Sequence, residues 1–397
     1  MEKGKDLSKI DEVLSQRVEE VLPKKEGLKK LMQERKIRVY LGVDPTGKNL
    51  HLGHTIPLRK LQEFADLGHE AILVMGTGTV LAGDPSQRES ARPKILEKEI
   101  KENIKTWKKQ VSNILDFSKV KIRQNGEWLL KLKLKDIIDI ASNVSAVRLF
   151  QRDMFQKRIS SGNTVWLHEV LYPVLQGYDS VFMDVDLEVG GSDQVFNMLV
   201  GRELQQKIRK KEKYVLTCPM ILGTDGKTMS KTSGNCIWIN DSPKDKFGKV
   251  MSVPDDLIIS YFKNLTNVSL GRISQHKKDL QTGRNPKEVK KELAFEIVKT
   301  YNSQREAEEA RREFEKIFEE KQAPSEMAEF SFQEKKMNIL DLLVKTKMAF
   351  SKGEAKRLVV QGGVRIRENT WTDWKGEVEL TPGVVINVGK RKFAKIK

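Results

Sequence analysis

The chain has 397 residues, of which 38% are hydrophobic and 32% charged, and its formal net charge is +17. This length is too great for one ordinary core and predicts two or three domains. No stretch approaches the roughly 18 uninterrupted apolar residues of a membrane helix. The N-terminus has neither the apolar run of a secretory signal nor the acid-poor composition of a transit peptide. We therefore expect a cytoplasmic protein without membrane contact.

The positive charge is concentrated near the C-terminus. Residues 335–397 contain 15 lysines and arginines against 6 acids, which is more than half of the total excess. A polyanionic partner is favoured because each cation placed on a phosphate releases counterions. A lysine-coated surface of no function is the alternative. The two cysteines, Cys218 and Cys236, stand apart without a C-x-x-C pattern or clustered histidines, so neither a disulfide framework nor a metal site is expected.

Residues 1–34 show helical spacing of apolar residues and predict an N-terminal helical segment. Residues 37–43 predict a buried strand, the spacing from Leu58 to Ala65 a helix, and residues 71–75 a second strand. This order indicates a parallel α/β sheet that binds ligands at the carboxyl ends of its strands. We therefore expect a Rossmann-like nucleotide-binding catalytic domain over residues 35–240.

The remaining segments follow in chain order. A Lys-rich helical insertion is expected at about residues 92–165, and a second, α-helical domain over residues 241–322. The polar stretch beginning at Gln322 predicts a linker over residues 323–334. Residues 335–397 predict a small α+β domain, with a helix over 352–360 and strand-like pieces at 364–367 and 383–388.

Residues 40–54, YLGVDPTGKNLHLGH, contain the first chemical signature. Two histidines, His51 and His54, flank a glycine where a strand and turn lead into a helix. Backbone N–H groups and the positive end of the helix dipole favour phosphate there. Gly53 would let a flat ring approach the backbone, and the histidines could donate hydrogen bonds to phosphate oxygens. Taken alone, the pattern also fits a helix start with two partly exposed histidines.

Residues 222–235, LGTDGKTMSKTSGN, form the second signature. A Gly- and Ser-rich loop carrying Lys227 and Lys231 can close a cation over a triphosphate and stabilise the departing pyrophosphate. By itself this segment fits a solvated surface loop equally well.

In this order the two segments resemble the HIGH and KMSKS signatures of class I aminoacyl-tRNA synthetases. From about residue 30 to the end, the chain is similar to the bacterial-type tyrosyl-tRNA synthetases. The resemblance implies activation of L-tyrosine with ATP and transfer of tyrosine to tRNA(Tyr). One position departs from the family pattern, since Thr228 stands where the family usually has the first lysine of the second signature. Lys227 is the expected substitute, and Lys231 matches the second lysine.

The resemblance also implies the residues of an amino-acid pocket. Positions 172, 176 and 179 are spaced i, i+4 and i+7, so one face of a helix can direct all three into one pocket. A core role for Tyr172 and a capping role for Asp179 are the alternative. The implied contacts are Tyr40 and Asp179 for the phenol, Asp84, Tyr172 and Gln176 for the ammonium, and Gln194 for the carboxylate end.

The remaining implied roles concern ATP. ATP with Mg²⁺ is the expected co-substrate, and no tightly bound cofactor or dedicated metal site is expected. The implied catalytic residues are Thr46, His51, His54, Lys227, Lys231, Arg88 and Arg92. Further ATP contacts are implied for Gly42, Asp44, Gly53, Gly191 and Asp193.

Residues 351–366 look like a small RNA-binding domain that is shared with a ribosomal protein. Lys352, Lys356 and Arg357 would meet tRNA phosphates, although a charged solvated helix is the alternative. The resemblance further implies a homodimer.

Three other functions are possible, and sequence features distinguish each of them from a tyrosyl-tRNA synthetase. A tryptophanyl-tRNA synthetase should lack the basic tail and the Tyr40–Asp179 pair. A non-catalytic RNA-binding relative should have lost the signature histidines and lysine. A small-molecule adenylyltransferase would not need the basic tail.

Overall fold

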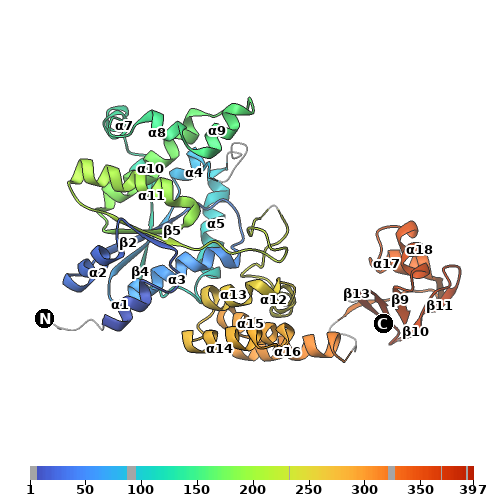
Figure 1. Ribbon diagram of the computed structural model, residues 1–397. Helices are drawn as coiled ribbons and strands as arrows, with labels where there is room; N and C mark the ends of the chain where they lie inside the picture. Colours follow the sequence, from blue (N-terminus) through green and yellow to red (C-terminus); the bar gives the residue numbers. More distant parts are fainter. Residues whose placement is uncertain (1–6, 87–94, 232, 321–326, 368, 390–391) are drawn as a thin grey trace. The chain divides into compact units, whose positions relative to one another are not determined.

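The computed structural model describes residues 7–86, 95–231, 233–320, 327–367, 369–389 and 392–397. The chain divides into two compact units between Ala307 and Glu308, and each is described by itself (Figure 1). Within the described residues, no helix is both long and apolar enough to cross a membrane.

A six-stranded sheet forms the centre of the first unit, in the order β1-β6-β5-β2-β3-β4. All neighbouring strands are parallel except the β1–β6 pair, which is antiparallel. β3 is an almost continuous apolar run buried on both faces, as is typical of an inner parallel strand. The strands are β1 (Glu20–Leu22), β2 (Arg38–Val43), β3 (Glu70–Met75), β4 (Val120–Gln124), β5 (Leu187–Gly191) and β6 (Tyr214–Cys218).

Helices cover both faces of this sheet, with α3 on one side and α10 and α11 on the other (Figure 1). Side chains alternate between the faces of a strand, so Arg38, Tyr40 and Gly42 of β2 face α10. Arg38 confirms this orientation, because its guanidinium donates to the carbonyl oxygen of Met183 at the end of α10. The helices are α3 (Leu52–Asp66), α10 (Leu167–Met183) and α11 (Val195–Leu204).

Two segments expected to be helical also supply strands to the sheet. Residues 1–34 contain α1 (Leu7–Val13) and α2 (Lys25–Glu34), but β1 lies between them and pairs with β6. The Lys-rich stretch at 92–165 likewise contains β4, which pairs with β3. Both are edge strands, and edge strands carry charges and little apolar sequence, so the periodicity gave no signal for them.

The rest of the first unit is helical. One group of short helices surrounds β4 and precedes α10: α4 (Thr79–Ala82), α5 (Glu97–Gln110), α6 (Gly126–Leu129), α7 (Leu134–Ala141), α8 (Ala146–Phe150) and α9 (Asp153–Ser160). A second group follows β6: α12 (Pro243–Met251), α13 (Ile258–Leu265), α14 (Leu270–Gln281), α15 (Pro286–Tyr301) and α16 (Gln304–Phe318), the last of which continues past the division between the units.

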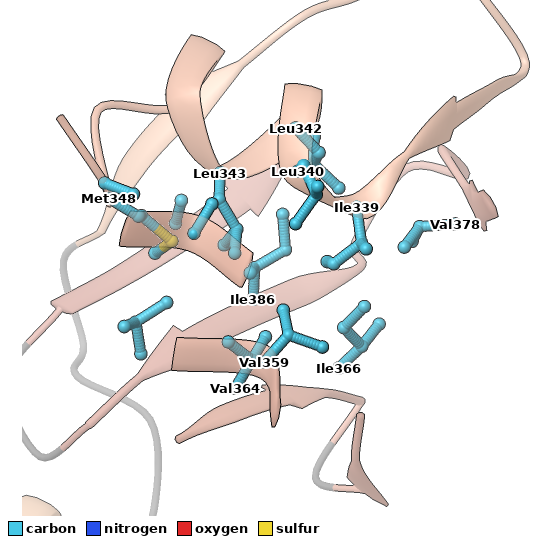
Figure 2. Packing of buried hydrophobic residues seen from close by; sticks show 14 of the residues in the cluster. Ile339, Leu340, Leu342, Leu343, Met348, Val359, Val364, Ile366, Val378 and Ile386 are labelled. Carbon is cyan, nitrogen blue, oxygen red and sulfur yellow. The ribbon is translucent and has the colours of Figure 1, made fainter. Parts of the chain in front are cut away.

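The C-terminal unit packs two helices, α17 (Ile339–Lys345) and α18 (Lys352–Val360), against small sheets. Figure 2 shows side chains of both helices meeting those of the strands in one apolar core. Ser351 caps α18 by accepting a hydrogen bond from the backbone of Glu354. The strands are β7 (Ala328–Phe330), β8 (Lys336–Asn338), β9 (Val364–Ile366), β10 (Asn369–Thr370), β11 (Glu377–Glu379), β12 (Val385–Val388) and β13 (Lys392–Ile396).

The expected linker at 323–334 contains one short strand, β7, among its described residues. This strand pairs in parallel with β13, so the five-stranded sheet has the order β10-β9-β12-β13-β7. β7 is only three residues long and mostly exposed, so its own sequence carries no strand pattern.

Candidate active site

The topology creates a crevice between β2 and β5. These strands are parallel neighbours, but the chain continues from β2 toward β3 on one side and from β5 toward β6 on the other. Ligands of open α/β sheets bind at such a switch point, outside the carboxyl ends of the strands. Gly42 is exposed near the end of β2 although this strand lies inside the sheet. The surface above β2 is therefore open to a ligand.

The two histidines of the first signature lie together at the start of α3. The backbone N–H of His51 donates to Nδ1 of His54 over 3.2 Å, and the ring centroids are 3.7 Å apart. A Cβ atom on Gly53 would lie 3.0 Å from Nδ1 of His51, so the glycine makes room for this ring. In the structure the His51 ring therefore fills part of the space expected for adenine.

Both histidines are neutral at physiological pH. Burial, together with the nearby Lys231 ammonium, lowers the pKa of His51 to about 3. Burial also holds the pKa of His54 well below its usual value. A neutral imidazole still has one N–H to donate to phosphate. Among the described residues, Lys231 is the cation whose charge acts on both rings.

Lys231 lies against the turn that follows β2. A Cβ atom on Gly47 would be 3.1 Å from its Nζ atom. Trp107 lies below, 5.8 Å from that Nζ atom to the ring centroid, and donates its indole N–H to the carbonyl oxygen of Gly47 over 2.6 Å. The two signatures, 180 residues apart in sequence, thus meet at one place.

Asn235 holds the second signature in shape. Its side-chain amide donates to Asp225 Oδ1 at 2.8 Å and to the carbonyl oxygen of Thr228 at 3.1 Å. Its Oδ1 accepts from the backbone N–H of Ser230 at 3.0 Å. Thr228 therefore contributes a backbone acceptor at the position of the missing lysine. Lys227 is exposed on the same turn, and its catalytic role stays a prediction.

Asp179 is buried on α10 and accepts two hydrogen bonds. Asn125 donates to its Oδ2 over 3.0 Å and the Trp128 indole to its Oδ1 over 2.8 Å. Burial raises the pKa of Asp179 to about 8, and these two hydrogen bonds oppose that shift. The alternative of a surface cap is wrong, because the carboxyl is a buried, oriented acceptor.

A chain of hydrogen bonds joins Asp179 to the end of β2. Asn125 also donates to Thr79 Oγ1, which in turn donates to Asp44 Oδ1 over 2.8 Å. The Tyr172 hydroxyl donates to Asp44 Oδ2 over 3.0 Å. Tyr172 and Asp44 were expected to hold the ammonium and ATP, respectively, but here their polar atoms bond to each other. Their direct contacts to substrate stay predictions.

Tyr40 and Gln176 lie over the same part of the sheet. Tyr40 is completely buried, and its hydroxyl lies 3.0 Å from Ser180 Oγ. Burial, followed by the charge of Glu188, raises the pKa of Tyr40 well above its usual value. The side-chain amide of Gln176 donates to Glu188 Oε1 over 2.9 Å. Tyr40 and Gln176, both expected in the pocket, are thus held in place by hydrogen-bond contacts with Ser180 and Glu188, respectively.

Asp84 and the segment after β5 meet across the crevice. The Gln194 side-chain amide donates to Asp84 Oδ2 at 2.9 Å and to Asp193 Oδ2 at 3.2 Å. A Cβ atom on Gly191 would lie 2.5 Å from Asp193 Oδ1, so any larger residue there would displace that carboxylate. Asp193 also borders a cavity of about 1010 Å³. The lining cations are Arg148, Arg152, Lys157 and Arg158.

Comparisons with known proteins agree with this geometry. The tRNA synthetases class I (W and Y) family matches residues 32–319, and the Tyrosine--tRNA ligase SYY-like C-terminal domain matches residues 319–396. A Tyrosine--tRNA ligase of Thermotoga maritima is 43% identical over 386 residues, covering 97% of this chain and 96% of that protein. One from Mannheimia succiniciproducens is 40% identical over 392 residues, covering 98% and 99%. The chain belongs to the tyrosine–tRNA ligase family.

Solved structures of tyrosyl-tRNA synthetases share the fold. The C-terminally truncated mitochondrial protein of Aspergillus nidulans aligns with a TM-score of 0.67 at 21% identity, covering 79% of this chain and 94% of that one. The Archaeoglobus fulgidus protein, complexed with L-tyrosine, aligns with a TM-score of 0.62 at 21% identity, covering 77% and 100%. At these identities the likeness shows the fold alone.

The C-terminal unit of this tyrosine–tRNA ligase family member presents its cations to solvent. Lys352, Lys356 and Arg357 are exposed on α18, while Ala355 and Val359 of the same helix are buried. The Lys356 ammonium lies 3.9 Å from the centroid of the Trp374 ring. Arg88 and Arg92 lie outside the described residues. Their roles stay predictions.

Several site residues of this ligase family member carried no recognisable sequence signal. Trp107 and Asn235 support the phosphate side, and Asn125 and Trp128 orient Asp179. They come from segments outside both signatures or from the tail of the second. Long-range contacts reveal Trp107, Asn125 and Trp128, whereas Asn235 acts within its own loop. A buried ion pair beneath Tyr40 was also missed, and it is taken up below.

Proposed function

We propose that this chain activates L-tyrosine with ATP and then transfers the tyrosyl group to the 3′ end of tRNA(Tyr). The observation that carries the proposal is the meeting of the two signatures after β2, where a chain of hydrogen bonds through Asn125 and Thr79 also joins Asp179 to Asp44. Family membership, the tyrosine-specific match of the C-terminal domain and the tyrosine–tRNA ligase relatives support the same reaction. They also disfavour the tryptophan alternative.

In the first step the tyrosine carboxylate attacks the α-phosphate of ATP. A new P–O bond forms, the bond to pyrophosphate breaks, and no covalent enzyme intermediate is needed. The protein contributes position and electrostatic stabilisation. His51 and His54 donate neutral N–H groups to phosphate oxygens, Lys231 supplies the charge, and Thr46 follows β2 in the same turn.

Magnesium enters this reaction with ATP as part of the substrate. In the described portion of the chain, no group of three or more His, Cys, Asp or Glu side chains is placed to hold a metal ion. Mg²⁺ would therefore be carried on the phosphates, where it neutralises their charge. Lys231 adds positive charge from the protein, with Lys227, Arg88 and Arg92 as the expected further cations.

Asp179 and Tyr40 select the phenol of the substrate. Phenylalanine would deprive both groups of the hydrogen bond that the phenol offers in a desolvated pocket, which is costly. Enzymes of this type are themselves a standard example of such rejection, which reaches about 10⁵ without editing. Asp84 and the amide oxygen of Gln176 hold the ammonium, with Gln194 at the carboxylate end.

In the second step the terminal ribose hydroxyl of tRNA attacks the carbonyl carbon of the adenylate and AMP leaves. The exposed α18 cations, Lys352, Lys356 and Arg357, would hold phosphates of the same tRNA. The cationic cavity beside Asp193 would favour the anionic end of the tRNA. A ligase that charges tRNA works where proteins are made, so we place it in the cytoplasm.

A homodimer is part of this proposal. Exposed apolar side chains gather on the consecutive helices α7 to α10, which lie together in Figure 1. Exposed apolar groups in such numbers mark an interaction surface. They are Leu134, Ile137, Ile138, Val147, Phe150, Ile159, Leu167 and Phe182. Leu134→Asp with Ile138→Asp should shift the mass measured by light scattering from dimer to monomer, whereas Leu270→Asp, on exposed α14, should not.

The reaction is tested by ATP–pyrophosphate exchange with each of the twenty amino acids. Exchange with tyrosine alone, followed by charging of tRNA(Tyr), is the expected result. Exchange with tryptophan would overturn the pocket assignment. Absence of exchange with every amino acid, together with tight RNA binding, would favour a non-catalytic RNA-binding protein.

A further inference from the structure

A buried ion pair lies beneath the amino-acid pocket. Lys213, just before β6, is 0% exposed, and Glu188, within β5, is 1% exposed. Glu188 is the register neighbour of Tyr40 on β2, and alternation along the strands places both on the face covered by α10. The Lys213 ammonium also donates to Ser180 Oγ over 2.8 Å and to the Met198 carbonyl oxygen over 3.1 Å. All three of its protons therefore have acceptors.

Stability alone is a poor reason for such a pair. Removing two charges from water costs free energy that their attraction only partly returns, and well-packed apolar residues often serve as well or better. The two ionic groups are therefore better explained by the groups that they hold in place. Glu188 contacts Gln176 directly, and Lys213 contacts Ser180, which in turn contacts Tyr40.

Glu188 orients Gln176. Its Oε1 accepts the side-chain N–H of Gln176 over 2.9 Å, which determines which end of that amide is the donor and which the acceptor. The Gln176 Oε1 atom is left buried, with no hydrogen-bond partner among the described residues. A buried acceptor without a partner is costly unless a ligand supplies a donor. The ammonium group of an amino acid is such a donor.

Lys213 orients the hydroxyl of Tyr40 through Ser180. An ammonium group can only donate, so Ser180 Oγ accepts from Lys213 and retains its own proton to give away. The Tyr40 hydroxyl lies 3.0 Å from that oxygen, whereas Ser180 Oγ donates to Glu188 Oε2 only over a longer and weaker contact of 3.4 Å. When Ser180 donates to Tyr40, the Tyr40 proton remains available for a phenol oxygen. The neighbouring Asp179 can then accept a hydrogen bond from the hydroxyl of the substrate phenol.

We propose that Lys213 and Glu188 are positioning residues that set the donor and acceptor directions of the tyrosine pocket through Ser180, Tyr40 and Gln176. Neither residue touches the substrate. Lys213 orients Tyr40, the phenol-binding residue, through Ser180. Glu188 orients Gln176, the ammonium-binding residue, by a direct hydrogen bond. This inference rests on the proposed tyrosine-activating function and extends it to residues that bind only other residues.

The test compares full-length variants in ATP–pyrophosphate exchange with tyrosine and with phenylalanine. Lys213→Met should raise the KM for tyrosine and lower the tyrosine-to-phenylalanine ratio of kcat/KM, each by about tenfold, while the KM for ATP changes by less than about twofold. Ser180→Ala keeps the ion pair but breaks its connection to Tyr40. It should reduce the same ratio even though the fold is intact.

Two further variants separate positioning from stability. Lys213→Met with Glu188→Gln removes both charges, so it should recover the melting temperature lost by Lys213→Met while its selectivity stays low. Lys60→Met is the matched control, because Lys60 is an equally buried lysine, paired with Glu63 in α3 on the other side of the sheet. It should lower the melting temperature and leave the KM for tyrosine unchanged.

Three results would overturn the inference. They are wild-type selectivity in Ser180→Ala, wild-type selectivity in the neutral double variant, and an equal loss of selectivity in Lys60→Met. Exchange by the wild-type enzyme separates this failure from failure of the proposed function. If the wild type does not exchange with tyrosine, the function itself is wrong. If it does and the variants behave like it, only the positioning role is wrong.

Discussion

The amino-acid pocket and the C-terminal unit treat polar groups in opposite ways. Around the pocket, Asp179, Glu188 and Lys213 are buried, and each has specific hydrogen-bond partners. In the C-terminal unit one cluster of apolar side chains forms the core between helices and strands, and cations such as Lys356 lie on the outside. The two regions of one chain therefore use charge for different purposes.

The difference follows from what each region has to recognise. A phenol differs from a benzene ring by one hydroxyl, and only oriented, desolvated partners can detect that difference strongly. A tRNA backbone offers many phosphates to exposed cations, which gain from counterion release without accurate placement. Single substitutions should therefore have large effects in the pocket and small effects in the C-terminal unit, where several cations share the binding.

The largest effect is expected at the boundary of the pocket, where Lys231 supplies positive charge to the transition state. Lys231→Ala should lower the rate of adenylate formation by about 100- to 1,000-fold, because an electrostatic group acting on the transition state is lost. Rapid-quench measurements should show that tyrosine binding is nearly unchanged. Lys227→Ala in the same assay tests whether that lysine, the expected substitute for the missing one, shares the role. An unchanged rate in Lys231→Ala would remove that lysine from the mechanism.

Within the pocket, Asp179→Ala should lower selection of tyrosine over phenylalanine on the order of 100-fold, since one of two phenol partners disappears. The measurement is the ratio of kcat/KM for the two amino acids in pyrophosphate exchange. Asp153→Ala, on the exposed start of α9, is a comparison for the loss of a carboxylate outside the tyrosine pocket. Preserved selection in Asp179→Ala would mean that the phenol lies elsewhere.

In the C-terminal unit, replacing Lys352, Lys356 and Arg357 together by alanine should raise the KM for tRNA about tenfold and leave pyrophosphate exchange unchanged. The slope of log KM against log salt concentration should fall by about 3, one for each phosphate contact. Any single replacement should have a much smaller effect. A matched control removes three exposed cations from the N-terminal region: Lys24, Lys30 and Lys36.

If the control raised the KM for tRNA equally, general charge and not α18 would bind the RNA. A loss of exchange in the α18 variant would contradict the separation of the two regions.

The last prediction concerns stability as a function of pH. The pKa of Asp179 is about 8 in the folded chain, against an ordinary value of 3.8. Between these values the unfolded chain has released this proton and the folded chain still holds it. The free energy of unfolding should therefore fall as the pH rises, by at most about 1.4 kcal/mol per unit from this group.

Asp179→Asn removes that contribution. Denaturant unfolding at several pH values should show the variant gaining stability relative to the wild type as the pH rises from about 4 to about 8. A constant difference would mean that Asp179 is already ionised in the fold, and that its partners Asn125 and Trp128 outweigh its burial.

Local pattern was enough to predict several elements from the sequence. α18 runs from Lys352 to Val360 as expected, and β2 and β3 agree with the expected strands to within one residue. The position of His51 at the start of α3 was also predicted. Helical and strand periodicities and signature spacing are properties of short windows, so no distant contact is needed to detect them.

Edge strands could not be predicted in the same way. β1, β4 and β7 are short or carry alternating charges, and they are strands because another part of the chain offers a free edge. Their sequences alone are compatible with helix or loop. The sheet order therefore required the tertiary structure.

The sequence by itself determined the family, the two signatures, the helical face carrying Tyr172, Gln176 and Asp179, and the basic C-terminal unit. Only the tertiary structure decided how the polar groups of the pocket are paired. The Lys213–Glu188 pair and the bond from Asn125 to Asp179 join residues 25 and 54 positions apart. Those partners are chosen by the strand order and by the exclusion of water, which no short window of sequence encodes.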